Sequence, residues 1–467
     1  MSMSMTIIIV VLLLLGYLAI ATSNFTNVNK AAVAMFLAVV FWILYISFGY
    51  GFVNHEHTRE YLIYLMGDAH TSENVKLFIA HNIFLKYVGK AAEVVLFLLA
   101  TMGIMEILET NGCFDFLKNF LRTRNSKVML WMMVLITFIL SANIESVTVT
   151  TMMLVLMHKL LAKRHERMIF GCAIMLAANC GGCLTVIGDP IGLALWSGEA
   201  VTASNYSFSL LVPVLIACGL PILLLSRKLP DRLELQWVAA PFRGDDTRMG
   251  IKQRIVMGLV ALVGLWFIPS FHNITKLSPF LGALCVLAVL WVMNEIYNRK
   301  LIQSDRMLQQ RKPLAMQQGG LQAVLYVIGI MLALGAVKET GFLTQLAQWL
   351  WDNVHNVFII GTIAGLISTV LESFTTAMTF FSLYDVAPKG ALGDAIWFMQ
   401  NGAYWKIIAF CTAIGGSIIS VGSLSGIVLM KMENIKISWF WKNFSGKVFL
   451  GWLLGMIFLF LQVYILN

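Results

Sequence analysis

Charged residues are scarce in this sequence: they make up 12% of its 467 residues, whereas 59% are hydrophobic and the mean hydropathy is +0.81. Apolar runs repeatedly reach or approach the roughly 20 residues that cross a bilayer, and no stretch has the composition of a separate soluble domain. The seven cysteines are scattered, which excludes a disulfide framework. We expect an all-α polytopic membrane protein, surrounded by membrane lipid.

The formal net charge of +9 does not indicate a nucleic-acid partner. Lys and Arg cluster in short loops between the apolar runs, where the positive-inside rule places them in a membrane protein. The first apolar run, residues 5–22, lacks the basic start and the small-residue cleavage site of a signal peptide, so we expect a retained span.

Hydropathy predicts about ten membrane crossings. The predicted spans are residues 5–22, 30–50, 89–109, 168–200, 208–226, 254–270, 277–297, 321–338, 403–430 and 447–466. Two further apolar segments, residues 127–162 and 356–388, each carry a Glu-Ser pair near the middle. Each segment either crosses twice or turns back inside the membrane as a re-entrant hairpin.

Loop charge separates these two alternatives. Basic residues flank segment 127–162 at both ends, so both ends should lie on the cytoplasmic side. Its arms on either side of Glu145 are too short for full crossings, which favours a hairpin with its tip near that residue. The flanks of segment 356–388 contain one basic residue, Lys389, so this hairpin should enter from the outside. Five predicted spans separate the hairpins, and inverted repeats require an odd number.

The chain therefore divides into two halves of inverted orientation. We expect a first half at residues 1–226, a cytoplasmic linker at residues 227–251 and a second half at residues 252–467. Each half contains one hairpin and one discontinuous helix. The hairpins are residues 127–162 and 356–388, and the broken helices are residues 168–200 and 403–430. Residues 94–110 and 324–340 also correspond, since both end in Glu-Thr.

Glycines interrupt the apolar run that follows each hairpin. The first break holds Gly181, Gly182 and Gly188 and ends in Asp189-Pro190, and the second places Ser423 where the first has Asp189. Glycine permits an unwound turn, and proline cannot donate a hydrogen bond to a continuing helix. Unwound backbone is tolerated at membrane depth only where protein or a water-filled cavity satisfies it.

The hairpin tips and glycine breaks supply oxygen ligands of the kind that small hard cations prefer. The candidate ion-binding residues are Glu145, Ser146, Thr148, Asn179, Thr185, Asp189, Glu372, Ser373, Thr375, Ser417 and Ser423. Their carboxylates, Glu145, Asp189 and Glu372, are the expected sodium ligands. Carboxylates inside membrane-length apolar sequence are costly and are usually functional.

Each acidic candidate also has a structural interpretation. The two hairpin Glu residues could be buried charges satisfied by neighbouring hydroxyls, and Asp189 could cap the second half of its broken helix. Glu93 and Glu106, in the span before the first hairpin, form a possible proton route, or they lie near the end of the span or pair within the bundle.

The sign of the charge predicts the transported species. No Lys or Arg falls within either hairpin tip or glycine break, whereas three carboxylates do. A cation is therefore the expected cargo. A buried carboxylate also resists ionisation, so a proton competes with the metal cation for the same site, which is the minimum that an exchanger needs. The sequence thus predicts a secondary transporter and not an enzyme.

These residues resemble those of NhaD-type sodium/proton antiporters, which belong to the ion transporter superfamily. The resemblance is carried by Ala92-Glu93 through Glu106, by Ser141-Ala142, by the stretch from Asn179 to Asp189 and by the run from Trp405 to Ser417 with Lys431-Met-Glu433. It covers about residues 85–225 and 320–465. It implies inverted repeats, an elevator-like mechanism, a homodimer, the inner (plasma) membrane, and sodium or lithium ions and protons as the transported species, without a cofactor.

One difference from that family concerns selectivity. The family typically has an Asp-Asn pair where this chain has Glu145-Ser146 and Glu372-Ser373, so the charge is kept and the amide is lost. The choice of cation and the stoichiometry stay open. The alternative function is a sodium-coupled symporter of a carboxylate or oxyanion, because the same superfamily includes such members.

Overall fold

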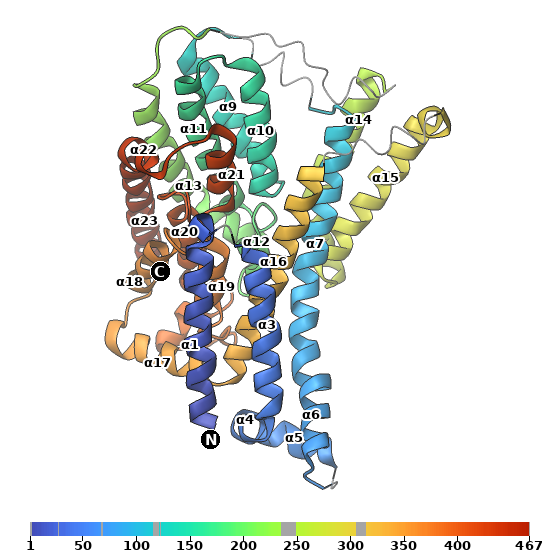
Figure 1. Ribbon diagram of the computed structural model, residues 1–467, viewed down its shortest axis with the longest axis vertical. Coiled ribbons are helices and arrows are strands. Elements are labelled where there is room, and N and C mark those ends of the chain that lie inside the picture. The colour runs from blue at the N-terminus through green and yellow to red at the C-terminus, as the bar shows by residue number, and fades with distance from the viewer. Residues whose placement is uncertain are drawn as a thin grey trace.

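The computed structural model describes residues 2–26, 28–66, 69–114, 121, 123–234, 249–304 and 314–466. Within these ranges the chain is helical, with two isolated β-bridges and no β-strand. Figure 1 shows a bundle elongated along one axis, with long helices running roughly parallel to that axis. The expected all-helical, polytopic architecture is confirmed.

Eight helical runs in the described residues are long and apolar enough to cross a membrane. They are α3 (Lys30–Ser47), the run Ser72–Thr110 that ends in α7 (Leu85–Thr110), α11 (Arg164–Leu184), α13 (Ala203–Ser226), α14 (Ile251–Thr275), α15 (Pro279–Ser304), α16 (Leu314–Glu339) and the run Ile437–Ile465, most of which is α23 (Gly446–Leu466). A ninth is formed if the pair α17 (Phe342–Val354) and α18 (Val357–Ser368), bent by 119°, counts as one span.

Two of the ten predicted spans are absent from these eight for definable reasons. The apolar part of α1 (Ser2–Ala21) is slightly short of the required length. The predicted span at residues 403–430 forms two shorter helices, α20 (Ala403–Gly415) and α21 (Leu424–Glu433). The glycine break between them is the reason, because it interrupts the helix where the sequence predicted a discontinuity.

The helices pack in two layers. The first layer consists of α1, α3, α7, α14, α15 and α16, which contact one another. The second, called the hairpin layer below, consists of α9 (Ser126–Ser141), α10 (Ser146–Leu160), α11, α12 (Pro190–Ser197), α13, α18, α19 (Ser373–Phe381), α20, α21 and α23. Between the layers, α7 contacts α12 and α16 contacts α19. In Figure 1, α13 and α23 lie on one side of the bundle, with α14 and α15 on the opposite side.

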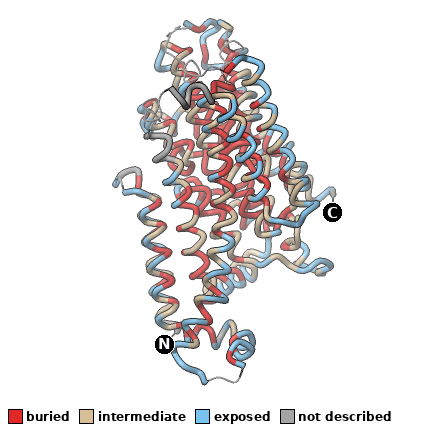
Figure 2. Tube along the Cα trace, turned by 90° about the vertical axis from the view of Figure 1, so that its right-hand side faces the viewer, coloured by how far each residue is buried: buried red, intermediate tan, exposed pale blue. Residues whose placement is uncertain are grey.

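Burial differs sharply between individual helices. In α11, at the centre of the hairpin layer, 83% of the apolar window is buried, whereas in α14 and α15 the share is 22%. Figure 2 shows buried residues concentrated in the body of the bundle and more exposed residues along its edges. Exposed apolar helices are the form that a lipid-facing surface takes.

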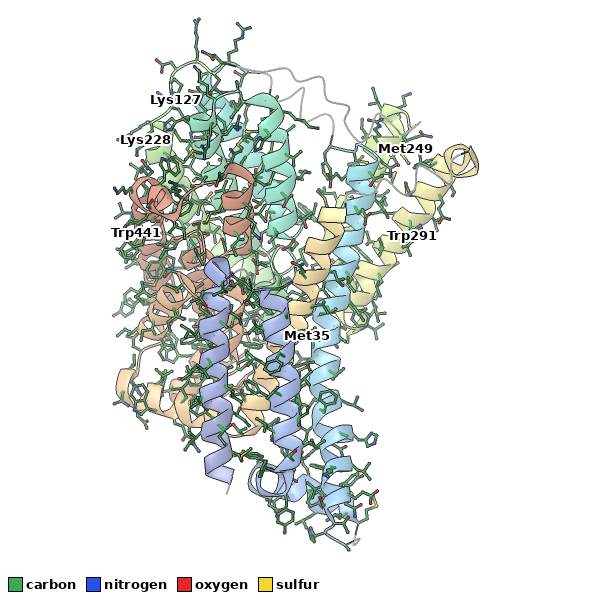
Figure 3. The ribbon with its side chains drawn as sticks, viewed as in Figure 1. Met35, Lys127, Lys228, Met249, Trp291 and Trp441 are labelled. Atoms are coloured by element: carbon green, nitrogen blue, oxygen red, sulfur yellow. The ribbon has the colours of Figure 1, made fainter. Side chains whose placement is uncertain are left out.

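The two pairs of hairpin helices begin in the same way but from opposite ends of the bundle. Asn125 caps α9 by accepting a hydrogen bond from Val128 N, and Asn356 caps α18 by accepting one from Ile359 N. In Figure 1, α9 and α10 lie at the upper end of the bundle, and α17, which leads into α18, lies toward the lower end. Lys127, at the start of α9, lies at that first end, with Lys228 on the same side (Figure 3).

The second parts of the broken helices cross over between the halves of the chain. Helix α12, from the first half, packs against α19 and α20, and α21, from the second half, packs against α10 and α11. Asn401 N donates to Ala200 O at 2.8 Å beyond α12, and Arg167 Nε contacts Glu433 Oε2 at 3.3 Å at the end of α21. The hairpin layer is therefore one interlocked unit. Of the predicted linker at residues 227–251, residues 235–248 lie outside the described residues.

Candidate ion-binding site

The two Glu-Ser pairs occupy equivalent positions at helix starts. Glu145 is the N-cap of α10, and its Oε2 accepts hydrogen bonds from Thr148 N at 3.1 Å and Thr148 Oγ1 at 2.8 Å. Glu372 is the N-cap of α19, and its Oε2 accepts from Thr375 N at 3.0 Å, while its Oε1 accepts from Ser373 Oγ at 3.2 Å. Both carboxylates are buried, with 5% and 2% of their surface exposed. Capping explains how the local fold tolerates them.

The second parts of the broken helices begin with caps of the same kind. Asp189 caps α12 by accepting from Ile191 N at 2.9 Å, and Ser423 caps α21 by accepting from Gly426 N at 3.1 Å. The structure thus gives Asp189 the capping position that the sequence left as one alternative. A carboxylate at a helix N-terminus is stabilised by the unsatisfied N–H groups there.

Each hairpin turn touches the glycine break of its own half through backbone atoms. A Cβ atom added to Gly188 would lie 2.4 Å from Ser141 O, and one added to Gly422 would lie 2.4 Å from Ser368 O. The serines of the two turns also donate to the broken helices: Ser141 Oγ to Ala178 O at 2.6 Å, and Ser368 Oγ to Thr412 O at 2.7 Å. Only glycine allows these approaches, so the breaks are needed for close packing as well as for unwinding.

The tips and breaks of both halves, together with α7 and α16, line one cavity of about 30 Å³. Seven of the predicted site residues line it: Glu145, Ser146, Asn179, Asp189, Glu372, Ser373 and Ser423. All three predicted carboxylates are therefore brought together, from segments far apart in the sequence. The volume is enough for about two water-sized groups, since one water needs roughly 10–15 Å³ measured in this way.

The cavity is strongly acidic. Its described lining contains three carboxylates and neither Lys nor Arg. Glu145 and Glu372 both interact electrostatically with Asp189. Lys30, at the start of α3, interacts electrostatically with Glu372 without lining the cavity. Several negative groups around so small a space favour binding of a cation or a proton.

The remaining four predicted residues lie outside the cavity lining and form hydrogen bonds to lining residues or to the hairpin turn and glycine break beside them. Thr148 and Thr375 hold the two Glu side chains, as described above. Ser417 accepts a hydrogen bond from Asn179 Nδ2 at 2.8 Å, which joins the two broken helices. Thr185 Oγ1 donates to Ala142 O in the first hairpin turn and accepts from Gly188 N at 3.1 Å.

The predicted proton-route residues lie outside the cavity lining. Glu93 Oε2 accepts a hydrogen bond from Ser197 Oγ at 2.6 Å, so it connects α7 of the first layer to the end of α12. Glu106 is exposed on the same helix, α7. A proton route through these two residues stays a prediction, and the bond between Glu93 and Ser197 makes pairing within the bundle a concrete alternative.

Two polar residues of the lining were missed from the sequence. Tyr326, from α16, is 3% exposed, and its hydroxyl is hydrogen-bonded to Thr375 Oγ1. Ser425, in the first turn of α21, is 1% exposed, and its Oγ has no hydrogen-bond partner among the described residues. The sequence signal for both is weak, because each is a single polar residue in an apolar run and lies outside the repeated Glu-Ser motif.

Comparison with known proteins adds independent evidence. The profile of the family described as citrate transporter matches residues 17–402. "Sodium/proton antiporter 1" of Arabidopsis thaliana is 27% identical over 95% of this chain and 70% of its own length, and "Sodium/proton antiporter 2" of the same plant is 25% identical over 95% and 96%. "Na(+)/H(+) antiporter NhaD" of Vibrio cholerae is 22% identical over 79% of this chain and 76% of its own length.

These matches confirm the resemblance to NhaD-type antiporters inferred from the residues. The matches to the two plant proteins cover 95% of this chain, so they include both hairpins and both halves. Because the family profile covers most of the chain, the family is established, and the protein is a transporter and not an enzyme. The chain is a multi-pass membrane protein that belongs to the citrate transporter family of secondary transporters.

Proposed function

We propose that the protein exchanges sodium or lithium ions for protons across the membrane. The observation that carries this proposal is the cavity of about 30 Å³ lined by Glu145, Asp189 and Glu372. Ser425 Oγ, which has no hydrogen-bond partner in the described part of the chain, offers a further oxygen ligand at the same place. Carboxylate and hydroxyl oxygens are the ligands that small hard cations prefer. The relatives named sodium/proton antiporters support the same assignment.

Exchange follows from competition for the same oxygens. Three carboxylates cannot all stay ionised in a buried space of this size without a bound cation, because the repulsion and the desolvation cost are too large. Protonation relieves the charge when the cation leaves, and deprotonation recreates it when a cation enters. Alternating occupation by cation and proton then couples the two fluxes.

Alternating access requires movement between the layers, and we assign the moving part to the hairpin layer. Its hairpins and broken helices interlock across the two halves of the chain, so they should move as one body against the first layer. Contacts that must break include the bond between Ser197 and Glu93 and the one between Trp266 Nε1 and Asn143 Oδ1. This is an elevator-like mechanism, with re-entrant hairpins in two inverted repeats, residues 1–226 and 252–467.

The same proposal includes the setting of the transporter. It places a homodimer in the inner (plasma) membrane, with residues 227–251 as a linker, and the basic residues of this linker support its cytoplasmic side under the positive-inside rule. The exposed apolar faces of α14 and α15 are available to lipid or to a second protomer.

The alternative function, sodium-coupled symport of a carboxylate or oxyanion, is favoured by the description of the family as citrate transporters. Two features of the cavity disfavour it. An organic anion of several carbon atoms needs a volume well above 30 Å³, and it needs cationic donors, whereas the described lining has three carboxylates and neither Lys nor Arg, and its one side-chain amide, Asn179, already donates to Ser417. We therefore rank exchange first.

Proteoliposomes that contain only this protein test the proposal. Addition of Na⁺ or Li⁺ should dissipate a preset pH gradient, and the double variant Glu145→Gln with Glu372→Gln should lose at least 90% of this activity while keeping its melting temperature within a few degrees. Glu73→Gln, an exposed residue at the start of α6 (Ser72–Phe78), is the matched control and should keep full activity. Unchanged exchange in the double variant, or sodium-dependent uptake of labelled citrate without proton exchange, would contradict the proposal.

A further inference from the structure

The hairpin layer contains a second cavity, apart from the ion-binding site. Its volume is about 220 Å³, and it is lined by α13, α20 and α23, by the short 3₁₀ helix η4 (Gly393–Phe398) and by residues 399–402, which lead into α20. The two cavity linings, as far as the structure describes them, share no residue. The space is enough for about 15 to 20 water-sized groups, so it can hold a ligand of many atoms.

The charge of this second cavity is opposite to that of the ion-binding cavity. Its described lining contains Lys406 and neither Asp nor Glu. Lys406 Nζ donates to two neutral acceptors on α13, Asn205 Oδ1 at 3.1 Å and Ser209 Oγ at 3.3 Å. No carboxylate in the described part of the chain pairs with it. Because an ammonium group has three N–H donors, one donor and the whole positive charge remain to be matched.

Three side-chain amides line the same cavity, namely those of Gln400, Asn401 and Gln462. Asn401 Oδ1 accepts from Thr202 N at 2.7 Å and from Thr202 Oγ1 at 3.0 Å, which leaves its Nδ2 to donate. The amides of Gln400 and Gln462 have no hydrogen-bond partner among the residues that the structure describes. Gln462 is the only amide in α23, which is mostly apolar, and polar residues in such helices are costly and are usually functional.

The neighbours of the lining residues are of the kind that face lipid. Phe208, next to Ser209 on α13, is 77% exposed, and Leu461, next to Gln462 on α23, is 47% exposed. Both helices belong to the runs that are long and apolar enough to cross a membrane. The cavity lies near the start of α13 and the end of α23, and Lys228, labelled in Figure 3, follows the opposite end of α13. A cationic cavity therefore lies close to helix ends whose outer surface is apolar.

We propose that this cavity binds the headgroup of an anionic phospholipid, with the phosphodiester at Lys406 and the three amides around it. Phosphate oxygens accept strong hydrogen bonds from an ammonium group, and basic pockets between membrane helices bind anionic headgroups in this way. The acyl chains would lie along the exposed apolar side chains of α13 and α23. This inference goes beyond the proposed function and does not depend on which ion the protein transports.

The absence of Asp and Glu from the described lining also selects the kind of headgroup. A zwitterionic lipid such as phosphatidylethanolamine would place an ammonium group close to Lys406, without a carboxylate of the lining to receive it. The headgroup of phosphatidylglycerol ends in an uncharged glycerol, whose hydroxyls donate to and accept from side-chain amides. We therefore expect phosphatidylglycerol to bind more tightly than phosphatidylethanolamine.

Native mass spectrometry of the protein in an uncharged detergent tests this by counting bound lipids. Phosphatidylglycerol should be retained as one tightly bound copy, and phosphatidylethanolamine should bind about tenfold more weakly. Lys406→Gln should weaken phosphatidylglycerol binding by about tenfold or more, whereas Lys406→Arg keeps the charge and should retain most of the binding. The matched control is Lys389→Gln, an exposed lysine of the segment that leads into η4 and lies outside the lining, which should bind like the unaltered protein.

Gln462→Leu keeps the proposal testable if Lys406→Gln does not fold. Leucine continues the apolar sequence of α23, so this variant should keep its melting temperature within a few degrees of the unaltered protein. It removes one amide donor from the cavity and should weaken phosphatidylglycerol binding by about threefold or more.

Glycerol 3-phosphate and citrate distinguish a lipid headgroup from a soluble anion. Neither should displace phosphatidylglycerol at matched concentration, because neither has the acyl chains whose buried CH₂ groups add to affinity. Displacement by either compound would show a site for a soluble anion and overturn the lipid assignment. Equal binding of the two lipids, or equal losses in Lys406→Gln and Lys389→Gln, would overturn the site itself. None of these measurements uses Na⁺-evoked proton flux, so the proposed function is tested separately.

Discussion

The contact between Gly188 and the first hairpin turn gives the sharpest single prediction. Alanine at this position would place its Cβ 2.4 Å from Ser141 O and 2.9 Å from both Cα and O of Gly182. All three are backbone atoms, which cannot move aside as a flexible side chain does. Ordinary contact begins at 3.4 Å, so the hairpin turn and the break must separate by about 1 Å.

The magnitude follows from that displacement. Overpacking of this kind typically costs about 1–3 kcal/mol of stability. The displaced turn leads directly into Glu145, so the carboxylate moves relative to the cation site, and a misplacement of about 1 Å can reduce a rate roughly 100-fold. We therefore expect Gly188→Ala to lower the melting temperature in detergent modestly and to reduce Na⁺-evoked proton flux in proteoliposomes by about two orders of magnitude.

The control is Gly89→Ala in α7, where an added Cβ meets no atom within 4 Å. Alanine in that helix should be neutral or stabilising by up to about 1 kcal/mol, with full transport activity. Gly422→Ala should reproduce the effect of Gly188→Ala, since its Cβ would lie 2.4 Å from Ser368 O. Gly188→Ala with the stability and activity of Gly89→Ala would refute the reasoning.

Two further predictions concern charges away from the cavity. The hydrogen bond from His57 Nε2 to Glu339 Oε2, at 2.6 Å, raises the pKa of His57. Protonated His57 therefore stabilises the folded protein fully below about pH 6.5, and this stabilisation is lost as the pH rises through the higher pKa of the folded state. Glu339→Gln should flatten that part of a plot of melting temperature against pH. Arg167→Ala removes the guanidinium from the buried carboxylate of Glu433, 1% exposed, which keeps His158 Nε2 at 2.6 Å, and should cost about 2 kcal/mol in the free energy of unfolding. Lys163→Ala breaks an exposed, solvent-screened pair and should leave that free energy nearly unchanged. Equal losses in chemical denaturation of the two variants would contradict the second prediction.

The parts of the fold that could be predicted from sequence are those with a strong local signal. The paired helices begin close to the expected positions because Asn125, Glu145, Asn356 and Glu372 are N-cap residues followed by apolar runs. The glycine breaks were predictable for the same reason, since glycine and proline disrupt a helix locally.

The site was predictable in composition but not in detail. The three carboxylates share one cavity as expected, because costly charged residues in apolar sequence indicate where the chain needs them. Tyr326 and Ser425 were missed, since a lone polar residue in an apolar helix gives no indication of which face it occupies. The contact between Glu93 and Ser197 depends on which helices of the two layers pack together, which hydropathy does not specify.

The crossing of α12 and α21 between the two halves has a consequence for synthesis. Arg167 and its partner Glu433 are 266 residues apart, so a ribosome adding roughly 5–20 residues per second needs about 15–50 s to produce the second after the first. During that interval the first hairpin is in the membrane without the helix that it packs against in the finished protein. The nascent chain must therefore be held in an incomplete arrangement, and a truncated first half expressed alone has no means of completing its own core.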